Sequence, residues 1–180
     1  MCFKDLIKEW RKKRRDRIYE GPFEDGGTKT NVDLDAPKKI DSSSLSRFSC
    51  KYSTLSFLEE DTGLRCGVYY VEASKDNDRV ILTVACSEGI DTGARRTEAR
   101  PLAFLATLDG ILKKYDVAAH NGYYSHTNAL PDFYGVNVEA EYSSGEILTA
   151  SDNNEVFLPI EFLRELCIVF GIENAHIDNE

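Results

Sequence analysis

The sequence predicts an α+β fold in which one antiparallel sheet, formed in the order βββαββα, carries two helices packed on one face. Three observations lead to this prediction. Apolar and polar residues alternate over several short stretches, and two other stretches place apolar residues on one helical stripe. The strands also come in runs instead of alternating strictly with helices, which argues against a parallel nucleotide-binding sheet.

Composition divides the chain into four parts. Residues 1–19 predict a basic amphipathic helix. Residues 20–44 predict a flexible linker, because Gly, Pro, Asp, Lys, Thr and Ser outnumber the apolar residues there. Residues 45–172 predict a single α+β domain, since the chain is 42% hydrophobic and long enough to bury one core. Residues 173–180 predict a polar tail.

The first three strands follow from alternation and from one turn. The first strand begins near Leu45, and residues 64–75 and 79–88 predict a hairpin because polar turn formers separate two apolar runs. We expect Asp76 and Asn77 to form a two-residue loop. That register pairs the residues of the core face as follows: Gly67 with Cys86, Tyr69 with Val84, Val71 with Leu82 and Ala73 with Val80.

The second half of the domain predicts a helix, two strands and a final helix. Residues 101–115 begin with proline, which suits the first helical position, and continue with leucines on one stripe. Residues 134–142 alternate as a strand with one exposed face, and a turn through Gly145 leads to a return strand. Residues 159–170 form the second helix, which Gly171 ends.

Charge is distributed unevenly along the chain. The net charge is −9, yet residues 1–20 hold eight Lys/Arg against four Asp/Glu, while the remainder holds fourteen against twenty-seven. An acidic domain repels phosphate backbones and anionic lipid head groups, so any affinity for nucleic acid or membranes is expected in the basic segment alone. The globular part is expected to bind a protein or a small molecule.

The expected location is the cytoplasm. No stretch approaches the roughly 18 uninterrupted apolar residues that cross a bilayer, and charges occupy the amino-terminal positions where a secretory signal needs an apolar run. The five cysteines are odd in number and include no close pair. That pattern predicts reduced thiols and neither a zinc knuckle nor a redox pair.

Residues 108–171, LDGILKKYDVAAHNGYYSHTNALPDFYGVNVEAEYSSGEILTASDNNEVFLPIEFLRELCIVFG, resemble an uncharacterised family of small bacterial proteins with cytosolic and lipid-anchored members. The shared pattern is a helix that ends in a Lys-Tyr turn, an Asn-Gly, a strand, a turn with Gly, a polar patch and a Phe/Leu-rich helix. Residues 131–133 depart from it, because Pro-Asp-Phe stands where the family has an Asp-Gly. The resemblance implies one α+β unit and transfers no catalytic residue.

Catalytic chemistry is not expected. Neither a Gly-x-Ser-x-Gly motif, a P-loop nor a Gly-x-Gly-x-x-Gly motif occurs in the chain, and no histidine lies in a recognisable triad pattern. His120, His126 and Asp132 are a conceivable metal set, but their spacing fits neither helical geometry nor a common zinc motif. We therefore predict no cofactor, no metal and no catalytic residue.

Two segments remain as candidates for recognition. One is a loop whose Tyr, His and Asn side chains are typical of contact residues: His120, Asn121, Tyr123, Tyr124, His126 and Asp132. The other is the amino-terminal helix, with an apolar stripe and a basic run: Phe3, Leu6, Ile7, Trp10, Arg11, Lys12, Lys13, Arg14, Arg15 and Arg17. The structural alternatives are a polar loop packed on the sheet edge, and a stripe that docks on its own domain or on a second copy.

The hypothesis that follows is a non-catalytic cytosolic module for protein interaction or ligand recognition. A protein partner fits the acidic domain best. The alternative is a peripheral binder of nucleic acid or of a membrane surface, which would act through the basic amino-terminal helix only.

Overall fold

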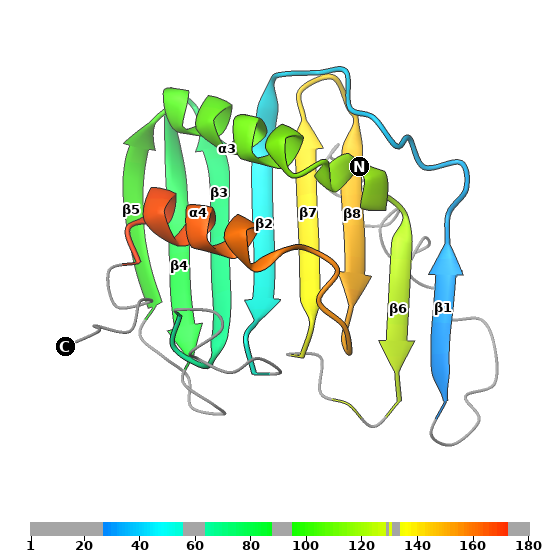
Figure 1. The fold of residues 1–180 in the computed structure, drawn as a ribbon. Coiled ribbons are helices and arrows are strands. Elements are labelled where there is room, and N and C mark those ends of the chain that lie inside the picture. The colour runs from blue at the N-terminus through cyan, green and yellow to red at the C-terminus, as the bar shows by residue number, and fades with distance from the viewer. Residues whose placement is uncertain (1–26, 56–63, 88–94, 129, 131–133, 173–180) are drawn as a thin grey trace, which may run out of the picture.

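The computed structural model describes residues 27–55, 64–87, 95–128, 130 and 134–172, and Figure 1 shows one sheet with helices across one face. The strands are β1 (Thr28–Val32), β2 (Leu45–Ser53), β3 (Val68–Asp76), β4 (Arg79–Ser87), β5 (Arg95–Pro101), β6 (Tyr123–Thr127), β7 (Val136–Tyr142) and β8 (Ile147–Asp152). The helical elements of the described ranges are α3 (Ala103–Lys114), the 3-10 helix η1 (Val117–His120) and α4 (Ile160–Phe170). The expected amino-terminal helix and the expected tail lie outside the described residues.

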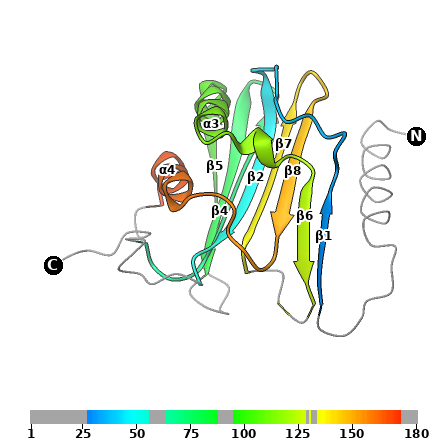
Figure 2. The ribbon, with the colours of Figure 1, turned by 45° about the vertical axis from the view of Figure 1, so that its right-hand side comes forward.

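The sheet is mixed. Its eight strands follow the order β1-β6-β8-β7-β2-β3-β4-β5, and all neighbours are antiparallel except β6 and β8. The parallel pair follows from the order in which the strands form. After α3 and η1 the chain forms β6, then β7 and β8, and β8 lies between β6 and β7 in the sheet. Figure 2 shows α3 and α4 on the same side of this sheet.

The predicted antiparallel sheet in the order βββαββα is therefore wrong. The sequence prediction missed three strands, and each lies at or near an edge of the sheet: β1, β5 and β6. Strands at or next to an edge bury less than central strands, so they lack the alternating apolar pattern. β5 is exposed at nearly every position, and Pro101, which was expected to begin a helix, is its last residue. β1 lies inside the stretch expected to be a linker.

The β3–β4 hairpin has the expected faces but different pairs. Tyr69 lies opposite Cys86 and Val71 opposite Val84, because the two-residue loop is Asn77 and Asp78, one position later than expected. Asn77 adopts the left-handed region at φ 55°, which asparagine tolerates better than most residues. Moving the loop by one residue shifts the register by two, which leaves every side chain on its predicted face.

The core lies between the sheet and the two helices. α3 contributes leucines and an isoleucine, and α4 contributes two phenylalanines and two leucines: Leu105, Leu108, Ile111, Leu112, Phe162, Leu163, Leu166 and Phe170. The rings of Phe104 and Phe170 meet edge to face at 5.2 Å and join the helices to each other. The buried Tyr52 hydroxyl donates to the Leu158 carbonyl at 2.7 Å, so the chain that enters α4 is fixed to the middle of the sheet.

Two further expectations concern reduced cysteines and the lack of a membrane-spanning stretch. The four cysteines among the described residues are thiols outside any disulfide, and burial raises the pKa of Cys167 to about 12. In the part of the chain that the structure describes, neither helix has the length and apolar content to span a bilayer.

Candidate functional site

An aromatic cluster forms where the helix layer ends, next to β6. The His120 ring, at the end of η1, lies 5.0 Å from the Phe157 ring, and the Tyr123 ring meets Phe157 edge to face at 5.5 Å. All three side chains are half-buried. Phe157 comes from the connection between β8 and α4, so three separate segments build the cluster. We call His120, Tyr123 and Phe157, together with Asp152 behind them, the aromatic site.

Asp152 holds the aromatic site in place. It ends β8 and is 3% exposed. One carboxylate oxygen accepts the Tyr123 hydroxyl at 2.7 Å, and the other accepts the backbone N–H groups of Asn154 and Glu155 at 2.7 and 2.9 Å. Burial and the bond to Asp152 raise the pKa of Tyr123 above its ordinary value. Tyr123 therefore stays protonated at neutral pH and is held in one orientation.

The surroundings of His120 favour the neutral form of its imidazole. Its partial burial lowers its pKa below the ordinary value, and this outweighs the effect of Asp116, which alone would raise the pKa. The charge of Lys38 adds to the decrease. A neutral imidazole beside Phe157 offers an aromatic face and one N–H donor.

The surroundings of the aromatic site are acidic. Asp116 acts on His120, and Glu155 acts on Tyr123 through its charge. Asp33 donates its backbone N–H to the Gly122 carbonyl at 2.9 Å, which places it beside the same turn. Lys38 is the nearby cation, and its ammonium group donates to the Asn121 carbonyl. Among the described residues, three carboxylates (Asp116, Asp152 and Glu155) act on these rings through their charge against the one cation Lys38, so the field at the site favours a positive ligand.

Asn121, which was expected to contact a ligand, has a structural role. It is 1% exposed. Its amide donates to the carbonyls of Pro37 and Ile147 at 2.9 and 3.1 Å and accepts the Thr149 N–H at 2.8 Å. All of these bonds fasten the segment before β2 to β8, and this matches the structural alternative for the polar loop.

The other residues of the expected recognition loop do not gather at one place. Tyr124 and His126 lie on β6, where side chains alternate between faces, so they point away from the face of Tyr123 and Ser125. Asp132 lies outside the described residues. The amino-terminal residues expected to interact, Phe3, Leu6, Ile7, Trp10, Arg11, Lys12, Lys13, Arg14, Arg15 and Arg17, also lie outside them.

Sequence reasoning missed Asp152, Asn153 and Phe157. Asn153 accepts the Thr127 N–H at 2.7 Å and donates to the Thr127 carbonyl at 3.1 Å, so it bridges β6 and the end of β8. A signal was present, because an Asp-Asn-Asn run followed by a phenylalanine directly after a strand is typical of a side chain-capped turn. Nothing in the sequence placed that turn beside His120.

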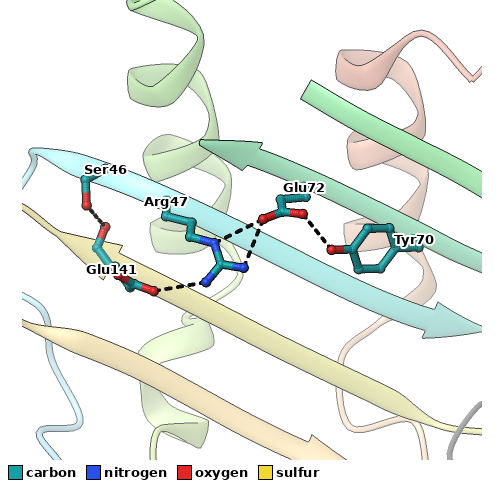
Figure 3. Close-up of polar contacts among 5 residues, drawn as sticks. All are labelled: Ser46, Arg47, Tyr70, Glu72 and Glu141. Carbon is teal, nitrogen blue, oxygen red and sulfur yellow. Dashed lines mark hydrogen bonds and ion pairs between the residues drawn. The ribbon is translucent and has the colours of Figure 1, made fainter. Parts of the chain in front are cut away.

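The opposite face of the sheet carries a second polar group of residues, shown in Figure 3. Arg47 of β2 donates through Nε and Nη2 to Glu72 of β3 at 3.1 and 2.9 Å, and through Nη1 to Glu141 of β7 at 3.2 Å. The Tyr70 hydroxyl donates to the other oxygen of Glu72 at 2.8 Å. We call the side of the sheet that carries these residues, away from α3 and α4, the open face.

The Arg47 group shifts the pKa values of its members. Partial burial alone would raise the pKa of Glu72, but the hydrogen bonds from Tyr70 and Arg47 outweigh it and hold that pKa below the ordinary value. Burial, followed by the bond to Glu72, raises the pKa of Tyr70 to about 12. Each donor thus has an acceptor, which is the arrangement of a structural ion-pair network.

Among the described residues, no three His, Cys, Asp or Glu side chains come close enough together to hold a metal ion. The Tyr123 hydroxyl is bonded to a carboxylate, and its pKa is raised. The arrangement offers aromatic faces and negative charge, which are means of binding.

Comparison of the whole chain with protein-family models, with curated proteins and with solved structures finds no match in any of the three. The resemblance of residues 108–171 to a family of small bacterial proteins stays a prediction. The candidate function is argued from the aromatic site itself.

Proposed function

We propose that this protein is a non-catalytic recognition module that binds a basic segment of a partner protein at the aromatic site. The observation that carries the proposal is the grouping of half-buried His120, Tyr123 and Phe157 rings within an acidic surrounding. A Lys or Arg side chain over an aromatic face gains cation–π energy, and carboxylates nearby add long-range attraction. The fixed bond between Tyr123 and Asp152 means that little side-chain entropy is lost on binding.

The test is a titration of the full chain against labelled peptides of defined charge. Peptides rich in Lys and Arg are compared with the same peptides in which Glu replaces each basic residue, by fluorescence anisotropy. We expect binding of the basic peptides only, and weakening by higher salt, because screening shortens the reach of the carboxylates. Equal binding of both peptide sets would contradict the proposal.

A matched pair of variants assigns the binding to the aromatic site. Phe157→Ala removes the ring that His120 and Tyr123 both contact, and we expect it to weaken the basic peptide about fivefold to thirtyfold, the value of a partly desolvated cation–π contact. Ile168→Ala is the control, since Ile168 is 69% exposed on α4, away from the site. An equal loss in both variants would show that the aromatic site is not responsible.

The alternative function, binding of nucleic acid or of an anionic membrane through residues 1–20, has support from the basic run alone. It predicts affinity for RNA, DNA or anionic vesicles that falls steeply with salt. Arg14→Glu combined with Arg15→Glu should abolish that affinity and leave peptide binding at the aromatic site intact.

We propose the cytoplasm as the location, supported by five cysteines without a close pair.

A further inference from the structure

The open face near β1 carries an aromatic side chain, an aliphatic one and two acidic ones among small polar residues. Register places Tyr124 of β6 beside Ser151 of β8, Thr149 of β8 beside Glu139 of β7, and Ile147 beside Glu141. These side chains alternate with the buried ones, so they all point away from α3 and α4. Among the elements that the structure describes, neither helix lies on this face (Figure 2).

The chain holds one segment with the complementary composition. Residues 3–18 place Phe3, Leu6, Ile7 and Trp10 at the spacing of one helical stripe, and a basic run from Arg11 to Arg17 follows. An amphipathic stripe is stable as a helix in water chiefly when it packs on an apolar surface. This segment therefore needs a surface to cover.

The connection is long enough to bring the segment to the open face. Residues 19–27, nine in number, join it to β1 and span up to about 30 Å when extended. β1 pairs with β6 and β6 with β8, so β8 lies about 10 Å from β1 at the usual spacing between strands. All of the open face over β6, β8 and β7 is within reach.

Charge favours the same placement. Residues 1–20 have four more basic than acidic residues, whereas the rest of the chain has thirteen more acidic than basic residues. On the open face, Glu139 and Glu141 lie beside Thr149 and Ile147 of β8, and Glu141 also pairs with Arg47 of β2. A helix whose stripe lies on β8 brings its basic run near these carboxylates.

We propose that residues 3–18 dock as a helix on the open face of their own domain, over β6, β8 and β7. The apolar stripe with Trp10 packs on Tyr124, Thr149 and Ile147, and the basic run lies beside Glu139 and Glu141. This inference is independent of the proposed peptide binding, because the aromatic site lies on the other face of the sheet.

Trp10 reports on the docking, since it is the only tryptophan in the chain. In the full protein we expect its emission to lie at shorter wavelength, and its quenching by acrylamide to be weaker, than in a synthetic peptide of residues 1–20. Thr149→Glu places a charge in the middle of the docking surface and should shift emission and quenching to the values of the peptide. Ile168→Glu is the control of equal charge on α4, and it should leave both at the wild-type values.

A second matched pair covers the case in which Thr149→Glu does not fold. Glu139→Lys reverses a charge on the open face, and Glu161→Lys reverses one on α4, where the Glu161 side chain is 58% exposed. We expect the first to increase quenching of Trp10 and the second to leave it unchanged. Circular dichroism checks that each variant retains the wild-type fold.

Four outcomes would overturn the proposal. The first is wild-type Trp10 quenching equal to that of the peptide, and the second is quenching that changes with protein concentration, which would place the segment on a second copy. The third is an equal response of the open-face variants and their controls. The fourth is loss of protection in Phe157→Ala with none in Thr149→Glu, which would place the segment on the aromatic site. In the first three outcomes peptide binding at the aromatic site is unaffected, so the two proposals fail separately.

Discussion

Gly122 determines how the segment before β2 meets the sheet. Its φ is +79°, and a Cβ atom there would lie 2.6 Å from the Ala36 Cβ atom. Its N–H donates to the Thr149 carbonyl at 2.8 Å, and its carbonyl accepts the Asp33 N–H at 2.9 Å. The turn that presents His120 and Tyr123 thus depends on a residue without a side chain.

We predict that Gly122→Ala lowers the free energy of unfolding by about 2–3 kcal/mol, because it adds backbone strain and a steric clash. Gly110→Ala is the matched control. Nothing lies within 4 Å of a Cβ atom at Gly110, which stands inside α3, so the same change should raise the free energy of unfolding by roughly 0.5–1 kcal/mol. Urea unfolding of both variants measures the difference, and a neutral Gly122→Ala would show that the turn tolerates a side chain.

Asn121 illustrates why polar residues of a loop are difficult to interpret from sequence. Its three side-chain hydrogen bonds go to backbone groups that lie 26 to 84 positions away in the chain. A buried amide with such partners is a structural element, because leaving those groups without bonds would cost free energy. From the sequence alone, the same residue is equally typical of a contact loop.

At the scale of elements, Arg47 joins the three central strands. It bonds to Glu141 of β7 and Glu72 of β3 from its place on β2, and its side chain is 33% exposed. A guanidinium group with several fixed donors is worth more than a single exposed pair. Solvent still screens part of this interaction.

We predict that Arg47→Ala lowers the free energy of unfolding at pH 7 by about 1 kcal/mol, and that Arg47→Lys recovers only part of it. The control is Lys39→Ala, whose pair with Asp41 is more than four-fifths exposed on both sides and should contribute nothing measurable. The wild type should also depend on pH. The pKa of Glu72 is lowered in the folded state. The ionised carboxylate therefore stabilises the fold above the ordinary carboxyl pKa, and this stabilisation is lost as the pH falls through the lowered pKa.

Urea unfolding between pH 3 and pH 7 checks this pH dependence. Arg47→Ala should reduce the loss of stability on the acid side, because Glu72 then titrates nearer its ordinary pKa. If the free energy of unfolding of Arg47→Ala falls on the acid side with the same slope as that of the wild type, Arg47 contributes little to the lowered pKa of Glu72.

At the scale of the whole molecule, the sheet is weakest between β6 and β8. Their parallel ladder contains two residue pairs, Tyr124 with Ser151 and Ser125 with Asp152, whereas β2 and β3 share seven. Asn153 and the bond between Tyr123 and Asp152 reinforce this junction through side chains. The aromatic site is therefore built across the least continuous part of the sheet.

We predict that the backbone amides of β1 and β6 exchange with deuterium faster than those of β2, β3 and β7, because local opening follows the least packed elements. Asn153→Ala should speed exchange in β6 further and leave β3 unchanged, since it removes the side-chain bridge to Thr127. Hydrogen exchange resolved by mass spectrometry measures both. Equal protection of β6 and β2 would show that the sheet opens as one unit.

The sequence by itself determined the elements whose side chains carry a period. β2 and β7 were predicted from alternation, β3, β4 and β8 from apolar runs and the turns beside them, and both described helices from their apolar stripes. Burial on one face imposes a repeat along the sequence. The faces of the β3–β4 hairpin were correct although its pairs were not, since alternation encodes the face and the turn encodes the register.

Only the tertiary structure decided the edges, the strand order and the candidate site. β1, β5 and β6 bury little, so no repeat marks them, and their pairing depends on partners far away in the chain. The prediction of His120 and Tyr123 placed two of the aromatic residues near each other, but Asp152 and Phe157 join them only because β6 lies parallel beside β8. Long-range contacts of this kind follow from how segments pack in three dimensions, and no local pattern records them.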